Sequence, residues 1–255
     1  FLNKSYTLNI LGELMKDHLL DLVQHTHGLG NINLVKVTGT DSETKLEAIA
    51  DDRTVILQAK FTGPVPAFIG TFGMPNLNKL KILLNLQEYK EDATLTLSKD
   101  ANSDPDGVNF ENKTGDFKNN YRFMKANVVT DKLKTPKFKG VNWHIEFQPQ
   151  AASIMRLKMQ AQANAEETTF QARTDGGHLK FFFGDHSSHA GDFIFHAGVN
   201  GTLSKAYRWP VGVVISILNL PGDKTFKISG DDGLIEIAVN SGIAEYRYLL
   251  PAQTK

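Results

Sequence analysis

Histidine and carboxylate side chains are the groups in this sequence that are best suited to bind a metal ion. Six of the eight histidines fall in two groups, which are His25 and His27, and His178, His186, His189 and His196. Zinc needs three or four ligands that converge on a rigid frame. The segment 184–192, GDHSSHAGD, has the composition of a flexible turn instead, so the sequence favours no zinc site here.

The acidic segment 100–111, DANSDPDGVNFE, offers oxygen ligands that a calcium ion prefers. Asp100 and Asp104 stand at plausible positions, but the sixth position of a calcium-binding loop requires a glycine, and Pro105 occupies it. We therefore expect an ordinary acidic turn in this segment. No metal or other cofactor is predicted.

Catalytic motifs are also missing from the sequence. It contains no phosphate-binding glycine loop and no Gly-x-Ser-x-Gly elbow, and it shows no paired carboxylates in an apolar setting. The chain has 0 cysteines, which excludes cysteine nucleophiles and thiolate metal sites. These observations predict a protein that is not an enzyme. An enzyme whose site cannot be recognised in one sequence is the alternative.

Charge is balanced overall but is segregated along the chain. The 28 basic residues equal the 28 acidic ones, yet residues 125–140 are rich in lysine and residues 88–106 are rich in acids. Such patches can steer a polyanion even when the net charge is zero. No apolar run approaches the roughly 20 residues that span a bilayer, and the first ten residues are too polar for a secretory signal. We expect no membrane association and a cytoplasmic location.

The elements that must position any site follow the same order twice. Residues 8–24 have leucines at helical spacing, three strand-like runs follow to residue 61, and a helix led by Pro75 precedes three more strands. After a lysine-rich connector, a strand at 141–147 and a helix at 150–166 precede a hairpin that turns at Asp175-Gly176-Gly177. A further strand, a helix led by Pro210 and three closing strands complete the chain.

Two stretches make the repetition explicit. LKILLNLQEYKEDATLTLSKD at 80–100 and VVISILNLPGDKTFKISGDDG at 213–233 share Leu-Asn-Leu, a short turn and an alternating strand. NNYRFMKA at 119–126 likewise matches AEYRYLLP at 244–251. The sequence predicts an α+β fold built from two duplicated domains, 1–126 and 141–255, joined by a connector at 127–140.

This arrangement resembles DNA polymerase sliding clamps. The resemblance spans essentially the whole chain and is carried by ARTDGGHLKFFFGD at 172–185, the two proline-led helices, NYRFMKA before the connector, and IAEYRYLLPAQ at 243–253. The trimeric clamps of T4-type phages are the most similar group, with PCNA rings more distant. The resemblance implies helices that line a ring, antiparallel sheets outside them, and a homotrimer, since two domains per chain need three chains to complete near-sixfold symmetry.

The family's function implies basic side chains on the lining helices, because duplex DNA is held through its phosphates without base readout. The residues that the resemblance places there are Lys16, Lys79, Lys81, Arg156, Lys158, Lys205 and Arg208. His25 and His27, at the end of the first lining helix, are further candidates. Two features depart from the pattern: the last helix has no basic residue of its own, and the first helix carries Glu13, Asp17 and Asp21.

The resemblance also implies an apolar pocket, near the connector and the C-terminal strand, for peptide tails of partner proteins. Its predicted residues are Val128, Val129, Leu133, Tyr246, Leu250 and Pro251. The implied partners are duplex DNA, the replicative DNA polymerase, an ATP-dependent clamp loader and further copies of this chain. A phage source would place the protein in the host cytoplasm. The remaining alternative is a β-rich phage structural or assembly protein that forms a ring without a lysine-lined hole.

Overall fold

The computed structural model describes residues 2–136, 140–185, 187 and 189–253, with side chains from residue 12 onward. The chain forms two compact units. The first comprises residues 1–52, 57–135 and 241–246, and the second comprises residues 53–56, 136–240 and 247–255. Residues 137–139 of the predicted connector lie outside the described residues.

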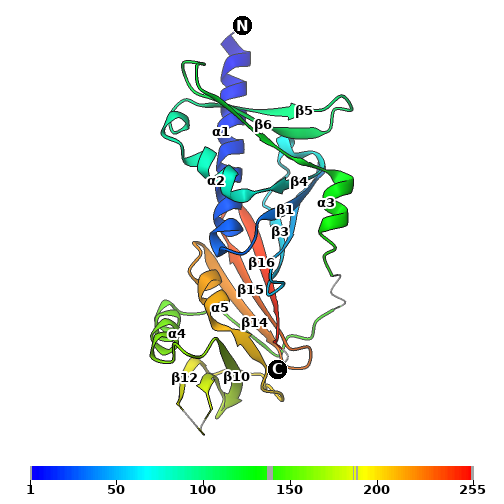
Figure 1. Ribbon diagram of the computed structural model, residues 1–255. Coiled ribbons are helices and arrows are strands. Elements are labelled where there is room, and N and C mark those ends of the chain that lie inside the picture. Colours follow the sequence, from blue (N-terminus) through cyan, green and yellow to red (C-terminus); the bar gives the residue numbers. More distant parts are fainter. Residues whose placement is uncertain (1, 137–139, 186, 188, 254–255) are drawn as a thin grey trace. The chain divides into compact units, whose positions relative to one another are not determined.

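Among the described residues, the first unit contains three helices and eight strands, of which β3 has its first residue in the second unit (Figure 1). Its helices are α1 (Leu2–His25), α2 (Leu77–Asn85) and α3 (Ala126–Lys132). Its strands are β1 (Leu34–Gly39), β2 (Thr44–Ile49), β3 (Ile56–Phe61), β4 (Gly70–Pro75), β5 (Thr94–Lys99), β6 (Pro105–Glu111), β7 (Lys118–Arg122) and β8 (Met124–Lys125). Three short 3-10 helices, η1 (His27–Leu29), η2 (Pro66–Phe68) and η3 (Gln87–Tyr89), connect some of these elements.

The second unit contains two helices, α4 (Ala151–Ala163) and α5 (Val211–Leu218). Its strands are β9 (Ile145–Phe147), β10 (Thr169–Asp175), β11 (His178–Gly184), β12 (Ala190–Ala197), β13 (Arg208–Pro210), β14 (Asp223–Ser229), β15 (Leu234–Asn240) and β16 (Ala244–Pro251). Strand β16 contributes its first three residues to the first unit and the rest to the second.

The strand order shows the duplication directly. In the first unit the order is β4-β1-β2-β3, and in the second it is β13-β10-β11-β12, so each strand has a counterpart at the same place. The strands that follow the second helix of each repeat are ordered β5-β6-β7 and β14-β15-β16. Helices α1 and α2 pack together in the first unit, as α4 and α5 do in the second. The predicted α+β fold with two duplicated halves is confirmed.

Apolar periodicity explains why these segments form these elements. Strand β1 alternates buried and half-buried residues, and Val37 lies opposite buried Leu46 of β2. In α2 the leucines occupy one helical face, and all four of its buried residues are leucines. The predicted hairpin pairs Asp175 with His178, and both glycines between them have positive φ, 58° and 76°.

Phenylalanines fill the space beneath the sheet of the second unit. Phe181 stacks on Phe195 with ring centroids 4.4 Å apart, and Phe147 stacks on Phe226 at 5.4 Å. All four side chains are buried. Offset-stacked and edge-to-face rings gain about 1 kcal/mol per pair beyond the burial of their surface. This packing explains the excess of phenylalanine, which has 16 copies in the sequence.

Three elements of the structure differ from the sequence-based prediction. Strands β4 and β13 directly precede the helices α2 and α5, and the proline-led segments were assigned to the helices alone. Both prolines instead end a strand. Pro210 ends β13, which lies at the edge of its sheet, and Pro75 lies beyond the residues of β4 that pair with β8, so in neither place does a neighbouring strand require the N–H that proline lacks. Residues 127–132, predicted as part of an irregular connector, belong to helix α3. Helix α1 also begins at Leu2, earlier than the predicted start at residue 8.

Candidate nucleic-acid interface

Helix α2 presents the clearest basic surface in the first unit. Its leucine face is buried, so the side chains of Lys79 and Lys81 fall on the opposite face and are exposed. Among the described residues neither lysine has an ion-pair partner. Both ammonium groups are therefore available to an external anion such as a phosphate.

Lys16 on α1 is engaged within the protein. Its Nζ donates to the main-chain oxygen of Tyr89 at 2.6 Å and to that of Lys90 at 3.2 Å. These bonds fasten α1 to the end of η3 and leave the side chain half-buried. The exposed side chains nearby on the same helix include the acids Glu13 and Asp17. Among the described side chains, the basic character of the first unit's helix pair therefore comes from α2 and not from α1.

Helix α4 provides the basic residues of the second unit's helix pair. Leu157 is fully buried, whereas Arg156 and Lys158 on either side of it are exposed. The Arg156 guanidinium lies over the ring of Phe193, 5.4 Å from its centroid, and Nη1 is 3.5 Å from the main-chain oxygen of Ile194. The aromatic contact fixes the direction of the guanidinium without neutralising its charge.

Lys205 and Arg208 both precede α5 but differ in their surroundings. Lys205 is exposed in the loop before β13. Arg208 is half-buried in β13, where its Nη1 donates to Thr169 Oγ1 at 3.4 Å. It lines a pocket of about 260 Å³ together with Arg173 and two aspartates, Asp185 and Asp192. The two residues are therefore not presented on the helix itself, and α5 contains no charged residue.

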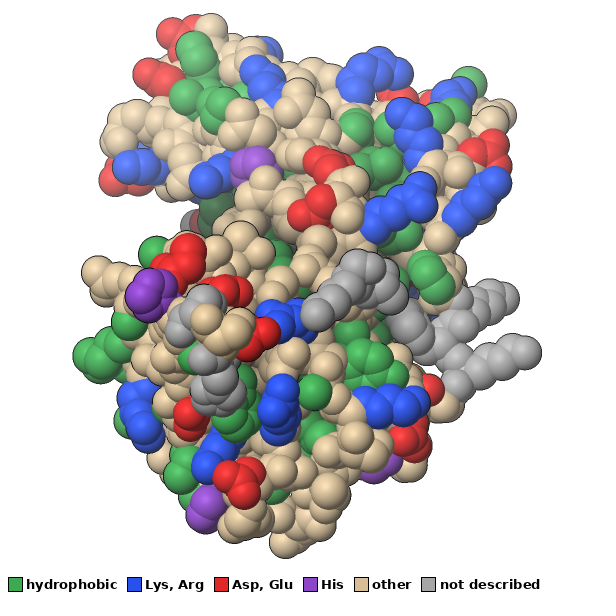
Figure 2. Space-filling view, turned by 60° about the horizontal axis from the view of Figure 1, so that its bottom comes forward, with side chains coloured by type: hydrophobic (Ala, Val, Ile, Leu, Met, Phe, Trp, Pro, Cys, Tyr) green, Lys and Arg blue, Asp and Glu red, His purple; other side chains and the backbone are tan. Residues whose placement is uncertain are grey.

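The acidic segment of the first unit is neutralised locally. Lys113 pairs with Asp92 at 2.6 Å, and Arg122 pairs with Asp106 at 2.9 Å. The face in Figure 2 likewise carries both basic and acidic side chains. The charge segregation along the sequence is thus weaker in three dimensions, and the exposed basic residues of α2 and α4 are among those without an ion pair in the described part of the chain.

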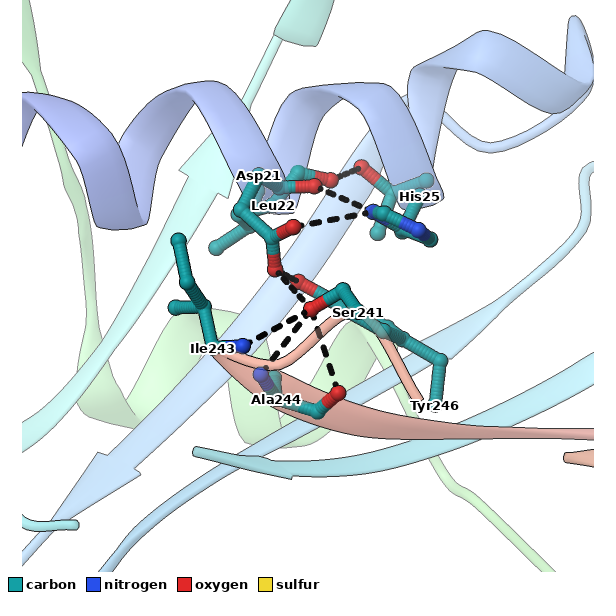
Figure 3. A network of polar contacts seen from close by, with 8 residues as sticks. Asp21, Leu22, His25, Ser241, Ile243, Ala244 and Tyr246 are labelled. Atoms are coloured by element: carbon teal, nitrogen blue, oxygen red, sulfur yellow. Dashed lines mark hydrogen bonds and ion pairs between the residues drawn. The ribbon is translucent and has the colours of Figure 1, made fainter. Parts of the chain in front are cut away.

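Asp21, the third acid of α1, is buried in a polar network (Figure 3). Its Oδ2 accepts hydrogen bonds from Tyr246 Oη at 2.7 Å and from Ser241 Oγ at 3.0 Å. His25 Nδ1 lies 3.3 Å from Asp21 Oδ1, and its ring stacks on Tyr246 with centroids 4.5 Å apart. Burial alone would raise the pKa of Asp21, but the hydrogen bonds from His25 and Tyr246 outweigh it and hold this pKa below its usual value.

This network holds elements of the first unit together. Ser241 Oγ also accepts from the main-chain N–H groups of Ile243 and Ala244, at 3.2 and 3.0 Å. The carboxylate therefore fastens the turn before β16 to the end of α1. His25, a candidate for contact with DNA, is fully buried here, whereas His27 is half-buried.

The residues predicted for the partner pocket differ widely in exposure. Val129, Leu133, Tyr246 and Leu250 are buried, whereas Val128 is 41% exposed and Pro251 is exposed. Val129 packs on Gly73 of β4 so closely that a Cβ at Gly73 would lie 2.8 Å from it. The Leu250 carbonyl accepts the indole N–H of Trp209 at 3.1 Å. Only Val128 and Pro251 of this set present a large free surface in the single chain.

No group of three or more potential ligands gathers around a common point in the part of the chain that the structure describes. His178 Nδ1 accepts the main-chain N–H of Gly198 at 3.3 Å, and His196 stacks on Phe147. Asp100 Oδ1 accepts the N–H groups of Asn102 and Asp104, at 2.9 and 3.2 Å, so the acidic turn is held by its own main chain. His186 lies outside the described residues. None of the described helices is long and apolar enough to cross a membrane.

Solved structures of PCNA-type clamps share this fold. A PCNA of A. fulgidus, bound to the C-terminal region of FEN-1, has a TM-score of 0.65 and 11% identity over 96% of both chains. A PCNA of Thermococcus kodakaraensis has a TM-score of 0.59 and 12% identity over 95% of this chain and 97% of that one. The PCNA2–PCNA3 complex of Sulfolobus tokodaii has a TM-score of 0.60 and 11% identity over 94% of this chain and 96% of that one. No protein-family model matches the chain, and no curated protein matches it.

The likeness covers the chain from end to end, so the chain has a PCNA-like sliding-clamp fold. Identities of 11–12% restrict this conclusion to the fold.

Proposed function

We propose that this chain is a sliding clamp that encircles duplex DNA and tethers a replicative DNA polymerase without performing chemistry. The observation that carries the proposal is the fold itself, in which each of two repeats contributes a packed pair of helices backed by antiparallel strands. Three such chains would supply six repeats, which suits a closed ring around a helical duplex. The similar solved structures are also named as PCNA, the sliding clamp that the sequence resembles.

The electrostatic attraction to DNA would come mainly from α2 and α4. Lys79, Lys81, Arg156 and Lys158 are exposed, and the two helices belong to different repeats, so positive charge would recur around the hole. Each phosphate contact releases counterions and makes binding weaken with salt, by a logarithmic slope of about 0.9 per contact. Lys16 and Arg208, which are half-buried, stay proposed DNA contacts. Lys205, which is exposed in the loop before β13, also stays one. Because no base edge is read, the ring would slide.

A specific strand contact suggests how the ring would close. In the first unit β3 is followed by Thr62, whose N–H and Oγ1 donate to the carbonyl of Ile243 just before β16, at 2.9 and 3.1 Å. The repeat makes β12 the counterpart of β3 and β7 the counterpart of β16. Both β12 and β7 are edge strands in the described sheets. Pairing of β12 in one chain with β7 in the next would repeat the β3–β16 contact between chains.

Partner proteins would bind at the surface of α3 in the first unit. Val128 is its exposed apolar residue from the predicted pocket, and buried Val129 and Leu133 would hold α3 in place beneath a bound peptide. Pro251, which is exposed in the second unit, stays a prediction from the sequence. The A. fulgidus PCNA binds the C-terminal region of another protein, which supports a peptide tail as the ligand. The polymerase and an ATP-dependent loader are the proposed owners of such tails. A phage source and the host cytoplasm stay predictions from the sequence.

The test combines solution mass with retention on DNA. Light scattering should give three times the chain mass of 28.3 kDa, and loader-assisted complexes should remain on nicked circular DNA but run off after linearisation. A chain that stays monomeric at every concentration would contradict the proposal, as would equal loss from both DNA forms. A ring with no retention on circles would instead indicate an assembly protein.

Ile194→Asp tests the proposed contact between chains. Ile194 lies on edge strand β12, and its side chain is half-buried, so a carboxylate there should weaken strand pairing with the next chain and lower the trimer fraction. Ile69→Asp is the matched control, because Ile69 is 45% exposed and lies outside both edge strands. Equal mass for Ile194→Asp and wild type would rule out β12 as the contact.

A further inference from the structure

The sheet of the second unit has a polar pocket on the face opposite to its aromatic core. Phe170 of β10 lies opposite Trp209 of β13, and both side chains are buried. The neighbouring pair, Gln171 and Arg208, therefore points to the other face, because side chains alternate along a strand. A pocket of about 260 Å³ lies there. The polar and aromatic residues that line it include Gln171, Arg173, Phe182, Asp185, Asp192 and Arg208.

The two arginines of this pocket lack a carboxylate partner. Neither Arg173 nor Arg208 forms an ion pair with a described residue, in contrast to Arg247, whose guanidinium binds a carboxylate through two nitrogens. Arg208 has a long hydrogen bond from Nη1 to Thr169 Oγ1 at 3.4 Å, and its buried Nε has no partner among the described residues. A guanidinium donates from every one of its nitrogens, so the donors of Arg208 are largely unmatched by the described part of the chain.

Both arginines are nevertheless held in place. The Arg173 guanidinium lies over the ring of Phe182, 5.0 Å from its centroid, and its Nη2 donates to Gln171 Oε1. The main chain of Arg208 pairs with Gln171 on one side, and its carbonyl accepts the N–H of Gln253 at 2.9 Å. These contacts keep both positive charges and reduce the freedom that the side chains would lose when an anion binds.

The aspartates of the pocket restrict the kind of anion that it can bind. Asp185 Oδ1 accepts the N–H of Ser187 at 2.9 Å, and Asp192 is exposed on β12. The described lining thus has two positive and two negative side chains. It disfavours a dianion such as phosphate and suits a single carboxylate between the arginines, because a carboxylate matches the fork of a guanidinium. The aspartates could then accept N–H groups of the peptide that carries this carboxylate.

We propose that this pocket binds an acidic side chain, aspartate or glutamate, of a partner protein. The guanidiniums of Arg173 and Arg208 donate to its carboxylate oxygens. The inference goes beyond the proposed function and does not rest on it, because the pocket belongs to the second unit alone and needs neither DNA nor a ring. Arg208 is also a proposed DNA contact. Its two roles compete, and variants of Arg208 decide between them.

Titration with two peptides that differ in one group tests the proposal. Acetyl-Gly-Glu-Gly-amide carries one carboxylate, and acetyl-Gly-Gln-Gly-amide has a neutral amide of the same shape. In NMR spectra of the intact protein, the glutamate peptide should shift the Nε–H signals of Arg173 and Arg208 in a saturable manner, and the glutamine peptide should not. Equal shifts with both peptides, or none with either, would overturn the proposal. Tighter binding of inorganic phosphate than of the glutamate peptide would assign the pocket to phosphate and would also overturn it.

Substitution of single arginines locates the binding site. Arg173→Gln and Arg208→Gln should each weaken the glutamate peptide on the order of tenfold, because each removes a charged donor from the carboxylate. Arg208→Lys keeps the charge without the fork and should fall between Arg208→Gln and the wild type. Arg156→Gln is the matched control, since its guanidinium also lies over an aromatic ring but does not line the pocket. An equal loss in the control would show that general charge attracts the peptide, and the proposal would fail.

DNA binding of the Arg208→Gln variant separates the two roles of this residue. Peptide binding should be lost, whereas the logarithmic salt dependence of DNA binding should stay that of the wild type. A salt dependence lower by about one, together with unchanged peptide binding, would return Arg208 to the DNA contacts and overturn the proposal. If the wild-type chain binds no DNA, the proposed function fails, and the peptide titration still decides whether the pocket binds a carboxylate.

Discussion

Replacing Asp21 by asparagine removes the charge at the centre of the network in Figure 3 while keeping the shape of the side chain. The wild-type carboxylate accepts from Tyr246 Oη at 2.7 Å and from Ser241 Oγ at 3.0 Å. An asparagine offers one accepting oxygen in place of two, and its amide group donates. An asparagine oxygen in the place of Oδ2 could still accept both hydroxyl bonds, but those bonds would then go to a neutral acceptor. Its amide group would stand where Oδ1 faces His25, and it provides no charge for that residue.

The magnitude follows from the number and type of bonds. A hydrogen bond to a charged group contributes about 1.5–3 kcal/mol, and an ordinary one contributes about 1 kcal/mol. Asp21 is buried, with 9% of its surface exposed, so water replaces these bonds poorly. We expect Asp21→Asn to lower the free energy of unfolding by about 2–4 kcal/mol. For a chain of this size that is a loss of about 5–15 °C in melting temperature.

The same network predicts a pH dependence. The pKa of Asp21 is lowered from its ordinary value of 3.8 in the folded protein. A lowered pKa means that the folded state binds this proton less readily than the unfolded chain, so the stabilisation is complete above that ordinary value and disappears as the pH falls through the folded pKa. The difference in stability between wild type and Asp21→Asn should therefore be constant from about pH 5 to 8 and should shrink below about pH 4.

Calorimetry of the wild type and three variants would decide the matter. Tyr246→Phe removes only the hydroxyl and should reproduce part of the loss. Asp17→Asn, on the same helix but exposed, is the matched control and should change stability by less than about 0.5 kcal/mol. A melting temperature of Asp21→Asn within 2 °C of the wild type would refute the argument that this carboxylate fastens α1 to the turn before β16.

Two further changes test the basic helix and the second unit's core. Lys79→Glu combined with Lys81→Glu should lower the logarithmic salt dependence of DNA binding by about two per chain, whereas Lys113→Glu, away from the helix pairs, should leave it nearly unchanged when affinity is titrated against salt. Trp209→Phe removes the indole bond to the Leu250 carbonyl and leaves a cavity in the second unit, so its melting temperature should fall by about 4–10 °C in calorimetry.

Local patterns predicted the fold class because the repeat duplicates both the patterns and their order. The leucine stripe of α2 and the alternation in β1 each depend on neighbouring residues alone, so the sequence specifies them. Strands β4 and β13 were missed for a physical reason. Each runs directly into a helix through a proline, and its short apolar segment has no turn to separate it from the helical pattern.

Contacts between residues distant in the sequence limited the prediction of the site. Lys16 is a basic residue on a helix that was expected to face DNA. Its ammonium group instead donates to the carbonyl groups of Tyr89 and Lys90, 73 and 74 residues away. Asp21 looked like a charge that would repel DNA, but its partners Ser241 and Tyr246 come from the far end of the chain. No periodicity within one helix carries that information.

The corrected charge distribution makes the two repeats more alike than the sequence suggested. Because Asp21 is buried and Lys16 is engaged, each unit has one helix with two exposed basic residues among the side chains that the structure describes, α2 in the first and α4 in the second. In the first repeat the basic helix is the later of the two, α2, whereas in the second repeat it is the earlier one, α4. A surface that attracts phosphates in general makes no fixed contact with any one of them. Its attraction depends on how many basic residues it has, and these residues need not stand at equivalent positions in the two repeats. The weak correspondence of individual basic residues between the repeats is therefore what a sliding contact would permit.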